Sequence, residues 1–360
     1  MADELHIRSG IKNYSICFSS LREIKDLLRN TPGTICVADA RVFDLHGSAL
    51  GLTAKDNPVL LKISEKMKNL DSVNRIYDEV MRRGVKKNSV LVSIGGGITQ
   101  DVTGFAASTI FRGIKWFYIP TTLLAQADSC MGSKTSLNYK TYKNLLGTFY
   151  PPDKILICPG LTGTLSVQDY YSGMGEVAKL AIMGGKKYAA ELYADLSMLD
   201  KRDPATLEKH ISRSLRIKKS FISGDEFDRG KRNMLNFGHC YGHAIEAASG
   251  FRIPHGQAVV LGMMLAGRDA VKYGLLRDNS FNMLLLRAIL KVNKREILSL
   301  SVPKIMAAME KDKKRETGNL ALIMTDDNYH MHKTVNLSHS QAQSTLNGFL
   351  KEYKDLEVKK

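Results

Sequence analysis

The first half of the chain alternates strand-like and helix-like segments, and this alternation constrains the fold more than any other feature of the sequence. Strand-like patterns cover residues 34–42, 89–97 and 114–120. An amphipathic helical pattern covers residues 70–84, and the segment 100–111 separates the last two strands. Neighbouring parallel strands need a crossover connection between them, which is usually a helix. The sequence therefore predicts an N-terminal α/β domain built on a parallel sheet.

The second half of the chain reads differently, because strand signals nearly vanish after about residue 161. Helical periodicities dominate there, and they cover residues 170–183, 203–222, 232–248, 256–274 and 302–313. A final strand lies among turn residues in the segment 151–160. We therefore expect two domains, an α/β domain at residues 1–158 and a mainly α-helical domain at residues 159–360.

A formal net charge of +16 is compatible with nucleic acid, an anionic membrane surface or a small anionic substrate as partner. The lysines and arginines are spread along the chain without interleaved aromatic residues, so we predict a small anionic substrate and no nucleic acid.

The N-terminus is charged and no run approaches 18 apolar residues, so we expect a cytoplasmic protein without a membrane partner. Five cysteines without a CxxC pair favour buried thiols over a disulfide framework or a cysteine-based zinc site.

Three of the nine histidines fall within the stretch from residue 236 to residue 257. His239 and His243 are one helical turn apart, so both imidazoles can point into the same cavity. Gly250 and Pro254 break that helix, and His255 can return to the cavity from the start of the next one. The pattern suits a metal ion or an anionic substrate, and the alternative is a polar helix with satisfied core histidines.

Other segments carry groups that could bind a ligand. The glycine triplet at residues 95–97 follows a strand and precedes a helix, which is typical of phosphate binding or of a tight turn. The segment 111–152 embeds polar residues among apolar ones, and burying them unpaired would be costly, so a ligand with phosphate and hydroxyl groups is expected there. Glu176 and Lys179 are three residues apart on a helix, where a surface ion pair is the alternative reading.

Taken together, these residues resemble a known family. The motifs GGGxxxDxxGF, RG, PTTLLAQADSxxGxKT, KNLxGxFYxP, GxxEVxK, NFGHxxGHAIE, HGxAVxxGM and DKK follow one another from about Asp39 to Lys314. Their order and approximate spacing are similar to those of dehydroquinate synthase, within the sugar phosphate cyclase superfamily. Eight motifs in register make the resemblance specific.

The resemblance implies a Rossmann-like NAD-binding domain, a helical metal-binding domain and an active site in the cleft between them. The implied metal ligands, for Zn²⁺ or Co²⁺, are Glu176, His239 and His255, a set that leaves coordination positions open. The implied NAD-binding residues are Asp39, Glu65, Lys68, Gly95, Gly96, Asp101, Thr121, Thr122, Lys143 and Thr164. The implied substrate-binding and catalytic residues are Asp128, Lys134, Asn144, Lys179, Lys218, Arg232, Asn236, His243 and Lys314, together with Arg112, which would reach the neighbouring subunit's site in a homodimer.

The activity that the resemblance implies is conversion of 3-deoxy-arabino-heptulosonate 7-phosphate to 3-dehydroquinate and phosphate. NAD-dependent oxidation, phosphate elimination, reduction and intramolecular aldol closure follow one another, and NAD is not consumed. Arg232 and Asn236 favour a substrate with a carboxylate. Three alternatives stay open: another sugar phosphate cyclase that forms a cyclitol, a glycerol-dehydrogenase-like oxidoreductase, and a non-enzymatic binding protein on the same fold.

The chain departs from the family pattern at several positions without losing an implied ligand. Gln100, Ser133 and Ser64 stand where glycine is usual, and Gln257 replaces the glutamate of the HGE motif. Gln257 removes a charge beside His255, which predicts a weakened or retuned metal affinity. The segment 40–63 also fits the family poorly. These departures suit either a divergent shikimate-pathway enzyme or a specialised paralogue.

Overall fold

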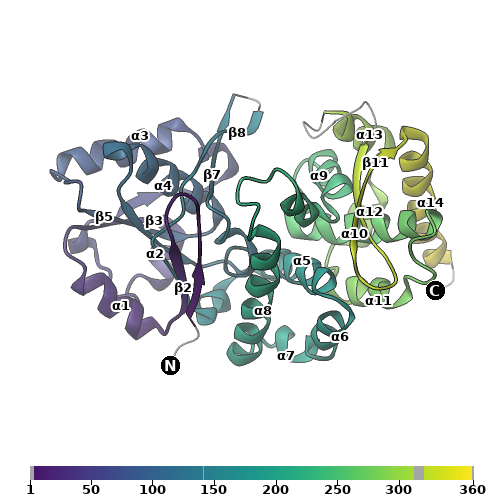
Figure 1. Cartoon of the computed structure of the whole chain (residues 1–360), viewed down its shortest axis with the longest axis horizontal. Coiled ribbons are helices and arrows are strands. Elements are labelled where there is room, and N and C mark those ends of the chain that lie inside the picture. Colours follow the sequence, from purple (N-terminus) through teal and green to yellow (C-terminus); the bar gives the residue numbers. More distant parts are fainter. Residues whose placement is uncertain (1–3, 141, 312–319, 359–360) are drawn as a thin grey trace. The chain divides into compact units, whose positions relative to one another are not determined.

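The computed structural model describes residues 4–140, 142–311 and 320–358. The chain divides into two compact units. The first comprises Met1–Leu165 together with the short segment Ile222–Phe227, and the second comprises Ser166–Phe221 and Asp228–Lys360. Figure 1 shows the strands of the first unit and the helices of the second.

A seven-stranded sheet forms the centre of the first unit, in the order β1-β2-β9-β6-β5-β3-β4. Only β1 runs antiparallel to its neighbour, and the other pairs are parallel, which confirms the predicted parallel sheet. The strands are β1 (Glu4–Ile7), β2 (Tyr14–Phe18), β3 (Thr34–Asp39), β4 (Val59–Leu61), β5 (Val90–Gly95), β6 (Lys115–Pro120) and β9 (Lys154–Ile157).

Helices join these strands as crossover connections. They are α1 (Leu21–Asn30), α2 (Ala40–His46), α3 (Leu70–Arg82) and α4 (Gly97–Thr109), with short turns η1 (Ala54–Asp56), η2 (Glu65–Met67), η3 (Ile110–Arg112), η4 (Ala125–Ser129) and η5 (Pro159–Thr164). Ser20 and Glu23 form a capping box that starts α1. Ile24 and Leu28 of that helix belong to one hydrophobic cluster with the buried strand residues Val92 and Ile94, so the core lies between helices and sheet.

Two details of the first unit differ from the sequence-based expectation. The strand predicted for residues 34–42 ends at Asp39, because the Asp39 carboxylate accepts a hydrogen bond from the Arg41 N–H and begins α2. The polar segment after β6 contains an antiparallel hairpin of β7 (Lys134–Tyr139) and β8 (Tyr142–Phe149), which forms a separate two-stranded sheet.

The second unit is mainly helical, as predicted. Its elements are α5 (Val167–Gly184), α6 (Lys186–Ala194), α7 (Leu196–Asp200), α8 (Pro204–Ile222), η6 (Lys231–Asn236), α9 (His239–Ala248), α10 (His255–Lys272), α11 (Ser280–Ile289), α12 (Lys294–Leu298), α13 (Val302–Glu310) and α14 (His339–Val358). A hairpin of β10 (Leu320–Thr325) and β11 (Met331–Leu337), which the sequence did not indicate, also belongs to it.

Glycines allow the helices that carry the histidines to pack closely. A Cβ atom on Gly175 of α5 would lie 2.2 Å from the Gly256 carbonyl oxygen of α10, and one on Gly262 of α10 would lie 1.9 Å from the Gly238 carbonyl oxygen. Gly238 has a φ of 77° and separates η6 from α9, so the single helix predicted for residues 232–248 is interrupted there. Helices α5 and α9 both pack against α10 as a result.

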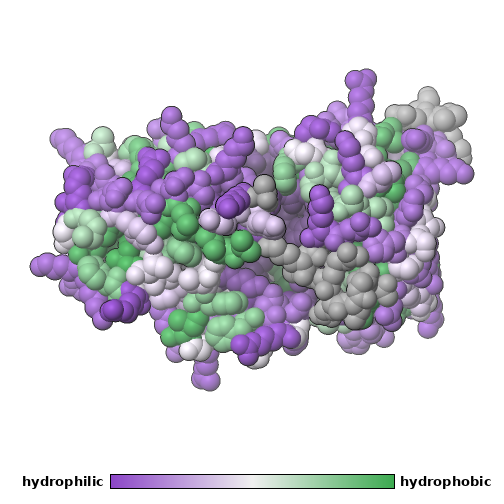
Figure 2. All heavy atoms as spheres, turned by 90° about the horizontal axis from the view of Figure 1, so that it is seen from above, coloured by the Kyte–Doolittle hydropathy of each residue, from purple (hydrophilic) through white to green (hydrophobic). Residues whose placement is uncertain are grey.

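No helix among the described residues is long and apolar enough to cross a membrane. Hydrophilic residues dominate the face of the molecule shown in Figure 2, and hydrophobic residues form smaller patches on it.

Candidate functional site

The predicted cofactor residues of the first unit gather at the carboxyl edge of the sheet. Asp39 ends β3, Gly95 ends β5, and Thr121 follows β6. These three strands are neighbours in the order β6-β5-β3. The chain leaves β3 toward β4 on one side and leaves β5 toward β6 on the other, so the topology switches between β3 and β5. Open α/β sheets bind ligands at this kind of switch point.

Close packing at the end of β5 leaves no room for a side chain at residues 95 and 96. A Cβ atom on Gly95 would lie 2.4 Å from the Thr99 hydroxyl oxygen, and one on Gly96 would lie 3.1 Å from the Thr122 methyl carbon. Gly96 is the N-cap of α4, so the free N–H groups of the first helical turn face outward from the sheet edge. Such a helix start favours a phosphate group.

The Thr121 hydroxyl at the same edge is buried and has no hydrogen-bond partner among the described residues. A buried hydroxyl in this condition fits a polar ligand. Thr164, at the end of η5, accepts or donates a hydrogen bond of 2.8 Å with His46 Nε2. Burial lowers the pKa of His46, which keeps that imidazole neutral. These groups fit the ribose and pyrophosphate of a dinucleotide.

Lys68 and Asp101 form an ion pair among the residues predicted to bind the cofactor. The Lys68 Nζ lies 2.6 Å from Asp101 Oδ2 and donates a hydrogen bond of 2.7 Å to Asn144 Oδ1. The N–H and the hydroxyl of Ser136 both donate to Asp101. Burial raises the pKa of Asp101, although Lys68 and Ser136 oppose that effect. The structure therefore brings Asn144, a predicted substrate residue, next to residues predicted for the cofactor.

Glu65 and Lys143 are more exposed and lie beside the contacts of Lys68, Asp101 and Asn144. Their charged atoms, Lys143 Nζ and Glu65 Oε1, are 3.8 Å apart. The Asn138 side-chain amide donates to the Glu65 carbonyl and carboxylate, and its oxygen accepts from the Asn144 N–H. The β7–β8 hairpin is held against η2 by these bonds.

In the second unit, three helices bring one carboxylate and three imidazoles together. His255 Nε2 lies 3.2 Å and His239 Nε2 lies 3.9 Å from Glu176 Oε1. The ligand atoms of His239, His243 and His255 all lie within 4.8 Å of one another. Only 2% of the Glu176 side chain is exposed, whereas His243 is exposed. This donor set fits a divalent ion of the zinc or cobalt type.

Hydrogen bonds at Nδ1 orient two of the rings. His239 Nδ1 lies 3.1 Å from the Phe237 carbonyl oxygen, and His255 Nδ1 lies 3.0 Å from Glu246 Oε2. In a neutral imidazole, an Nδ1–H that donates to such an oxygen leaves the Nε2 lone pair free for a metal ion. Both Nε2 atoms face Glu176.

The charges around the two rings move their pKa values in opposite directions. Burial, together with Lys179 and the neighbouring imidazoles, holds the pKa of His239 well below its usual range. Burial also acts to lower the pKa of His255, but the Glu176 and Glu246 carboxylates outweigh it and raise that pKa to about 10. Without a metal ion, His239 is neutral and His255 is protonated at neutral pH.

We expect the affinity of this cluster for Zn²⁺ to rise about tenfold per pH unit between pH 7 and pH 8. A metal ion binds only the deprotonated imidazole, so each ion must displace the proton of His255, whose pKa is about 10. Titration of the metal-free protein with Zn²⁺ at the two pH values measures this slope. Glu246→Gln removes one of the two carboxylates that raise this pKa, so the proton should be displaced more easily and the slope should level off at a lower pH. An affinity of the wild type that does not change with pH would contradict the expectation.

The remaining predicted residues differ in burial. Asp128, Lys179, Lys218 and Arg232 are buried, and Asn236 is half-buried and donates a hydrogen bond of 3.0 Å to the Asn233 carbonyl oxygen. Lys179 Nζ lies 2.6 Å from Glu176 Oε2, so this pair is not the surface ion pair that was the alternative reading. Lys134 and Arg112 are exposed. Lys314 lies outside the described residues.

Sequence reasoning missed Glu246 as the partner of His255. Glu246 lies three residues after His243 on α9, so the helical spacing carried a signal for it. Gln257, by contrast, is buried away from the imidazoles. Its side-chain amide donates to the Tyr171 carbonyl oxygen, and its oxygen accepts from the Lys291 N–H. The carboxylate beside His255 is therefore present, and it comes from residue 246.

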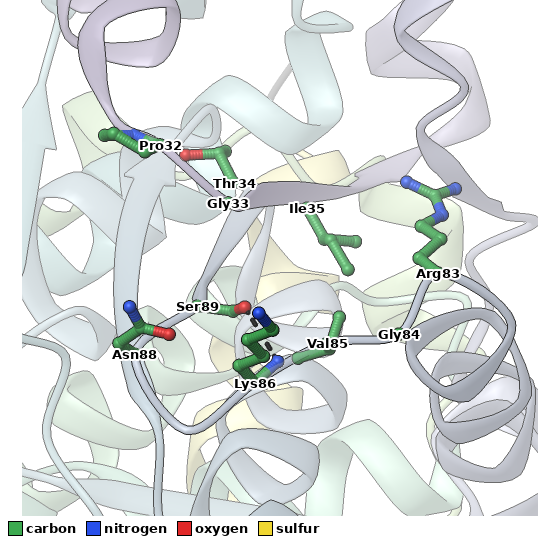
Figure 3. Close-up of a pocket in the computed structure, with 10 residues that line it drawn as sticks. All are labelled: Pro32, Gly33, Thr34, Ile35, Arg83, Gly84, Val85, Lys86, Asn88 and Ser89. Carbon is green, nitrogen blue, oxygen red and sulfur yellow. Dashed lines mark hydrogen bonds between the residues drawn. The ribbon is translucent and has the colours of Figure 1, made fainter.

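A cavity of about 370 Å³ lies at the opposite, amino edge of the sheet (Figure 3). It is lined by residues 32–35 and by residues 83–89 except Lys87. Its Arg83 guanidinium is already bonded to Glu79 and to the Asn57 carbonyl oxygen. Because none of the predicted site residues lines it, the strand topology and the histidine cluster locate the candidate site better than this cavity does.

Comparison with known families gives a consistent result over most of the chain. The family model described as "3-dehydroquinate synthase N-terminal" matches residues 58–172. The one described as "3-dehydroquinate synthase C-terminal" matches residues 173–315. A curated relative from Crocosphaera subtropica, a 3-dehydroquinate synthase, is 34% identical over 306 residues. That alignment covers 81% of this chain and 83% of the relative.

Solved structures of sugar phosphate cyclases share the fold. ValA, a 2-epi-5-epi-valiolone synthase from Streptomyces hygroscopicus subsp. jinggangensis with NAD⁺ and Zn²⁺ bound, gives a TM-score of 0.80 at 24% identity and covers 96% of this chain and 99% of its own. A 2-deoxy-scyllo-inosose synthase complexed with carbaglucose-6-phosphate, NAD⁺ and Co²⁺ also gives 0.80, at 23% identity, with the same coverage. At these identities the likeness concerns the fold alone.

Proposed function

The chain belongs to the 3-dehydroquinate synthase family and is a phosphate-eliminating cyclase of that kind, and we propose that its buried cations and its histidine cluster carry the reaction. The substrate is a sugar phosphate, and within the family it is 3-deoxy-arabino-heptulosonate 7-phosphate, which yields 3-dehydroquinate and phosphate. The observation that supports this assignment most directly is the convergence of Glu176, His239 and His255, with both Nε2 atoms aimed at the buried carboxylate.

The two units supply different parts of the chemistry. We propose that Glu176, His239 and His255 hold a divalent ion, Zn²⁺ or Co²⁺, and that the carboxyl edge of the sheet holds NAD. When bound, NAD supplies a reversible hydride acceptor and the metal ion supplies a Lewis acid for a ring oxygen of the substrate. The Gly95–Gly96 backbone binds the pyrophosphate, and Asp39 accepts hydrogen bonds from a ribose.

The cations of the site bind the anionic groups of the substrate. Arg232 is only 5% exposed, and a buried guanidinium matches a carboxylate with two parallel hydrogen bonds. Lys134, Lys218 and His243 balance the charge of the phosphate group, both before and after the C–O bond breaks. Lys179, fixed by its 2.6 Å contact with Glu176, keeps a positive charge beside the metal ligands. A site with many cations and few general bases stabilises a departing phosphate.

The experiment that tests the proposal is incubation of the protein with 3-deoxy-arabino-heptulosonate 7-phosphate, NAD and Zn²⁺, followed by measurement of released phosphate and of 3-dehydroquinate. Both products should appear in equal amounts. Phosphate release without the carbocycle would contradict the proposed reaction.

We expect NAD to be recycled within each turnover, because the hydride taken from the ring returns to it before the carbocycle closes. Substoichiometric NAD should therefore support many turnovers, with no build-up of the near-ultraviolet absorbance of reduced nicotinamide. Product and absorbance can be followed in the same sample. One reduced NAD per product would instead indicate the glycerol-dehydrogenase-like oxidoreductase.

We also propose that the enzyme is a homodimer in which Arg112 reaches the neighbouring subunit's site. Phe111 and Arg112 are both exposed and have φ values of 49° and 62°. Two consecutive non-glycine residues in the left-handed region are strained, and such strain is often kept where a turn has a function.

We propose the reducing cytoplasm as the location of the protein, because five free cysteines suit a reducing compartment.

A further inference from the structure

Glu226 is a residue that neither the proposed catalytic residues nor the proposed metal ligands include, and it accepts three hydrogen bonds in the first unit. Its Oε1 accepts from the Ser9 hydroxyl at 2.6 Å and from the Ser133 hydroxyl at 2.8 Å. Its Oε2 accepts from the Gly10 N–H at 2.7 Å. Hydrogen bonds to a carboxylate are stronger than those between neutral groups. The carboxylate thus joins two segments that are far apart in the sequence.

Ser133 is strained in the conformation that makes this bond. Its φ is 65°, in the left-handed region that favours glycine, and its side chain is buried. The Ser133 hydroxyl donates to Glu226, and the Ser133 carbonyl oxygen accepts from the Tyr150 N–H at 2.6 Å. Both groups of this residue are therefore bonded although its backbone conformation is unfavourable for a residue other than glycine.

A second contact holds the same loop. Phe227 packs edge to face on Phe149 of β8, with ring centroids 5.1 Å apart. Ile222–Phe227 consequently belongs to the first unit, although the chain on both sides of it belongs to the second. Lys218 lies four residues before this loop and Arg232 lies five residues after it.

We infer that Ser133 and Glu226 form a positioning pair, which fixes the turn before Lys134 to the loop Ile222–Phe227 and thereby orders the substrate-binding residues next to both segments. The inference rests on the proposed function for the roles of Lys134 and Arg232. Neither Ser133 nor Glu226 touches the substrate. The pair lowers the cost of substrate binding because the two segments are held before the substrate arrives.

The first test is structural and does not depend on activity. Ser133→Gly removes the hydroxyl and suits the positive φ, so the variant should fold. Hydrogen exchange of the amides in residues 222–227 should become about tenfold faster in Ser133→Gly, as expected when one hydrogen bond to a charged group is lost. Asn57→Gly is the matched control, because Asn57 also has a positive φ, of 49°, and its backbone groups bond to Ala54 and Arg83. Unchanged hydrogen exchange in Ser133→Gly would contradict the inference that Ser133 and Glu226 hold this loop.

The second test is kinetic. In Ser133→Gly, KM for the seven-carbon acid phosphate should rise about tenfold with kcat and the Kd for NAD unchanged within twofold, since only ordering before binding is lost. In a Glu226→Ala background, the further change Ser133→Gly should have no effect on KM. Faster exchange with unchanged KM would overturn the positioning role. If the wild type does not turn over this substrate, the proposed function fails, and the exchange experiment still decides whether the pair holds the loop.

Discussion

Replacing His255 with alanine is expected to abolish metal binding and to reduce turnover by roughly 10³-fold, because a Lewis acid contributes several kcal/mol to charge stabilisation in the transition state. His255 supplies one of two Nε2 atoms that face Glu176, and its ring is held in the required tautomer by Glu246. The variant should stay folded, since a third of the His255 side chain is exposed and the α5–α10 packing depends on glycine contacts beside it.

Elemental analysis measures the bound metal, circular dichroism tests whether the variant is folded, and phosphate release measures turnover. His6→Ala is a suitable control, because the His6 side chain is 76% exposed and lies in β1, outside the cluster. Full metal occupancy in His255→Ala would show that His255 is not a ligand. His243→Ala then becomes informative, because the three imidazoles lie close enough for His243 to take its place.

Replacing Arg232 with alanine should cost about 2 to 4 kcal/mol of transition-state binding toward the seven-carbon acid phosphate, since it breaks a buried charge pair from one side. That cost corresponds to a loss of about 30- to 900-fold in kcat/KM. Arg232 is 5% exposed, so little water can replace its contact with a carboxylate. Arg229→Ala is the matched control, because Arg229 is exposed and lies just before η6, the short helix that contains Arg232.

The decisive comparison uses substrates with and without the carboxylate. Turnover of 3-deoxy-arabino-heptulosonate 7-phosphate should fall in Arg232→Ala, whereas turnover of sedoheptulose 7-phosphate and glucose 6-phosphate should stay level or rise. Arg232→Lys keeps the charge without the two parallel donors, so an intermediate loss is expected. A wild type that prefers either neutral sugar phosphate would place the chain with the cyclitol-forming cyclases.

Much of the fold was predictable because its signals are local. Strand periodicity and crossover lengths gave the parallel sheet, and helical periodicity gave α5, α8, α10 and α13. The β10–β11 hairpin was missed, because its strands alternate weakly and pair only with each other. The end of β3 was misplaced because the side-chain cap at Asp39 outweighs the strand propensity of the residues that follow.

Local sequence patterns were enough to predict which residues could form the candidate site. The four-residue spacing of His239 and His243, the helix break before His255, and the glycines after a buried strand are local patterns, and the order of the motifs identified the family. These features depend on residues near one another in the chain, where helical and strand geometry fix what each side chain can face.

Which of those groups lie in contact depends on how distant segments pack. The approach of α5 to α10 at Gly175 and Gly256 brings Glu176 to His255, and the Glu176 and Glu246 carboxylates together raise the pKa of that imidazole against the effect of burial. Likewise, Glu226 reaches Ser133 across 93 residues of sequence. Such contacts depend on backbone packing and on burial between distant segments, and no local periodicity encodes the distance between two atoms that the fold brings together.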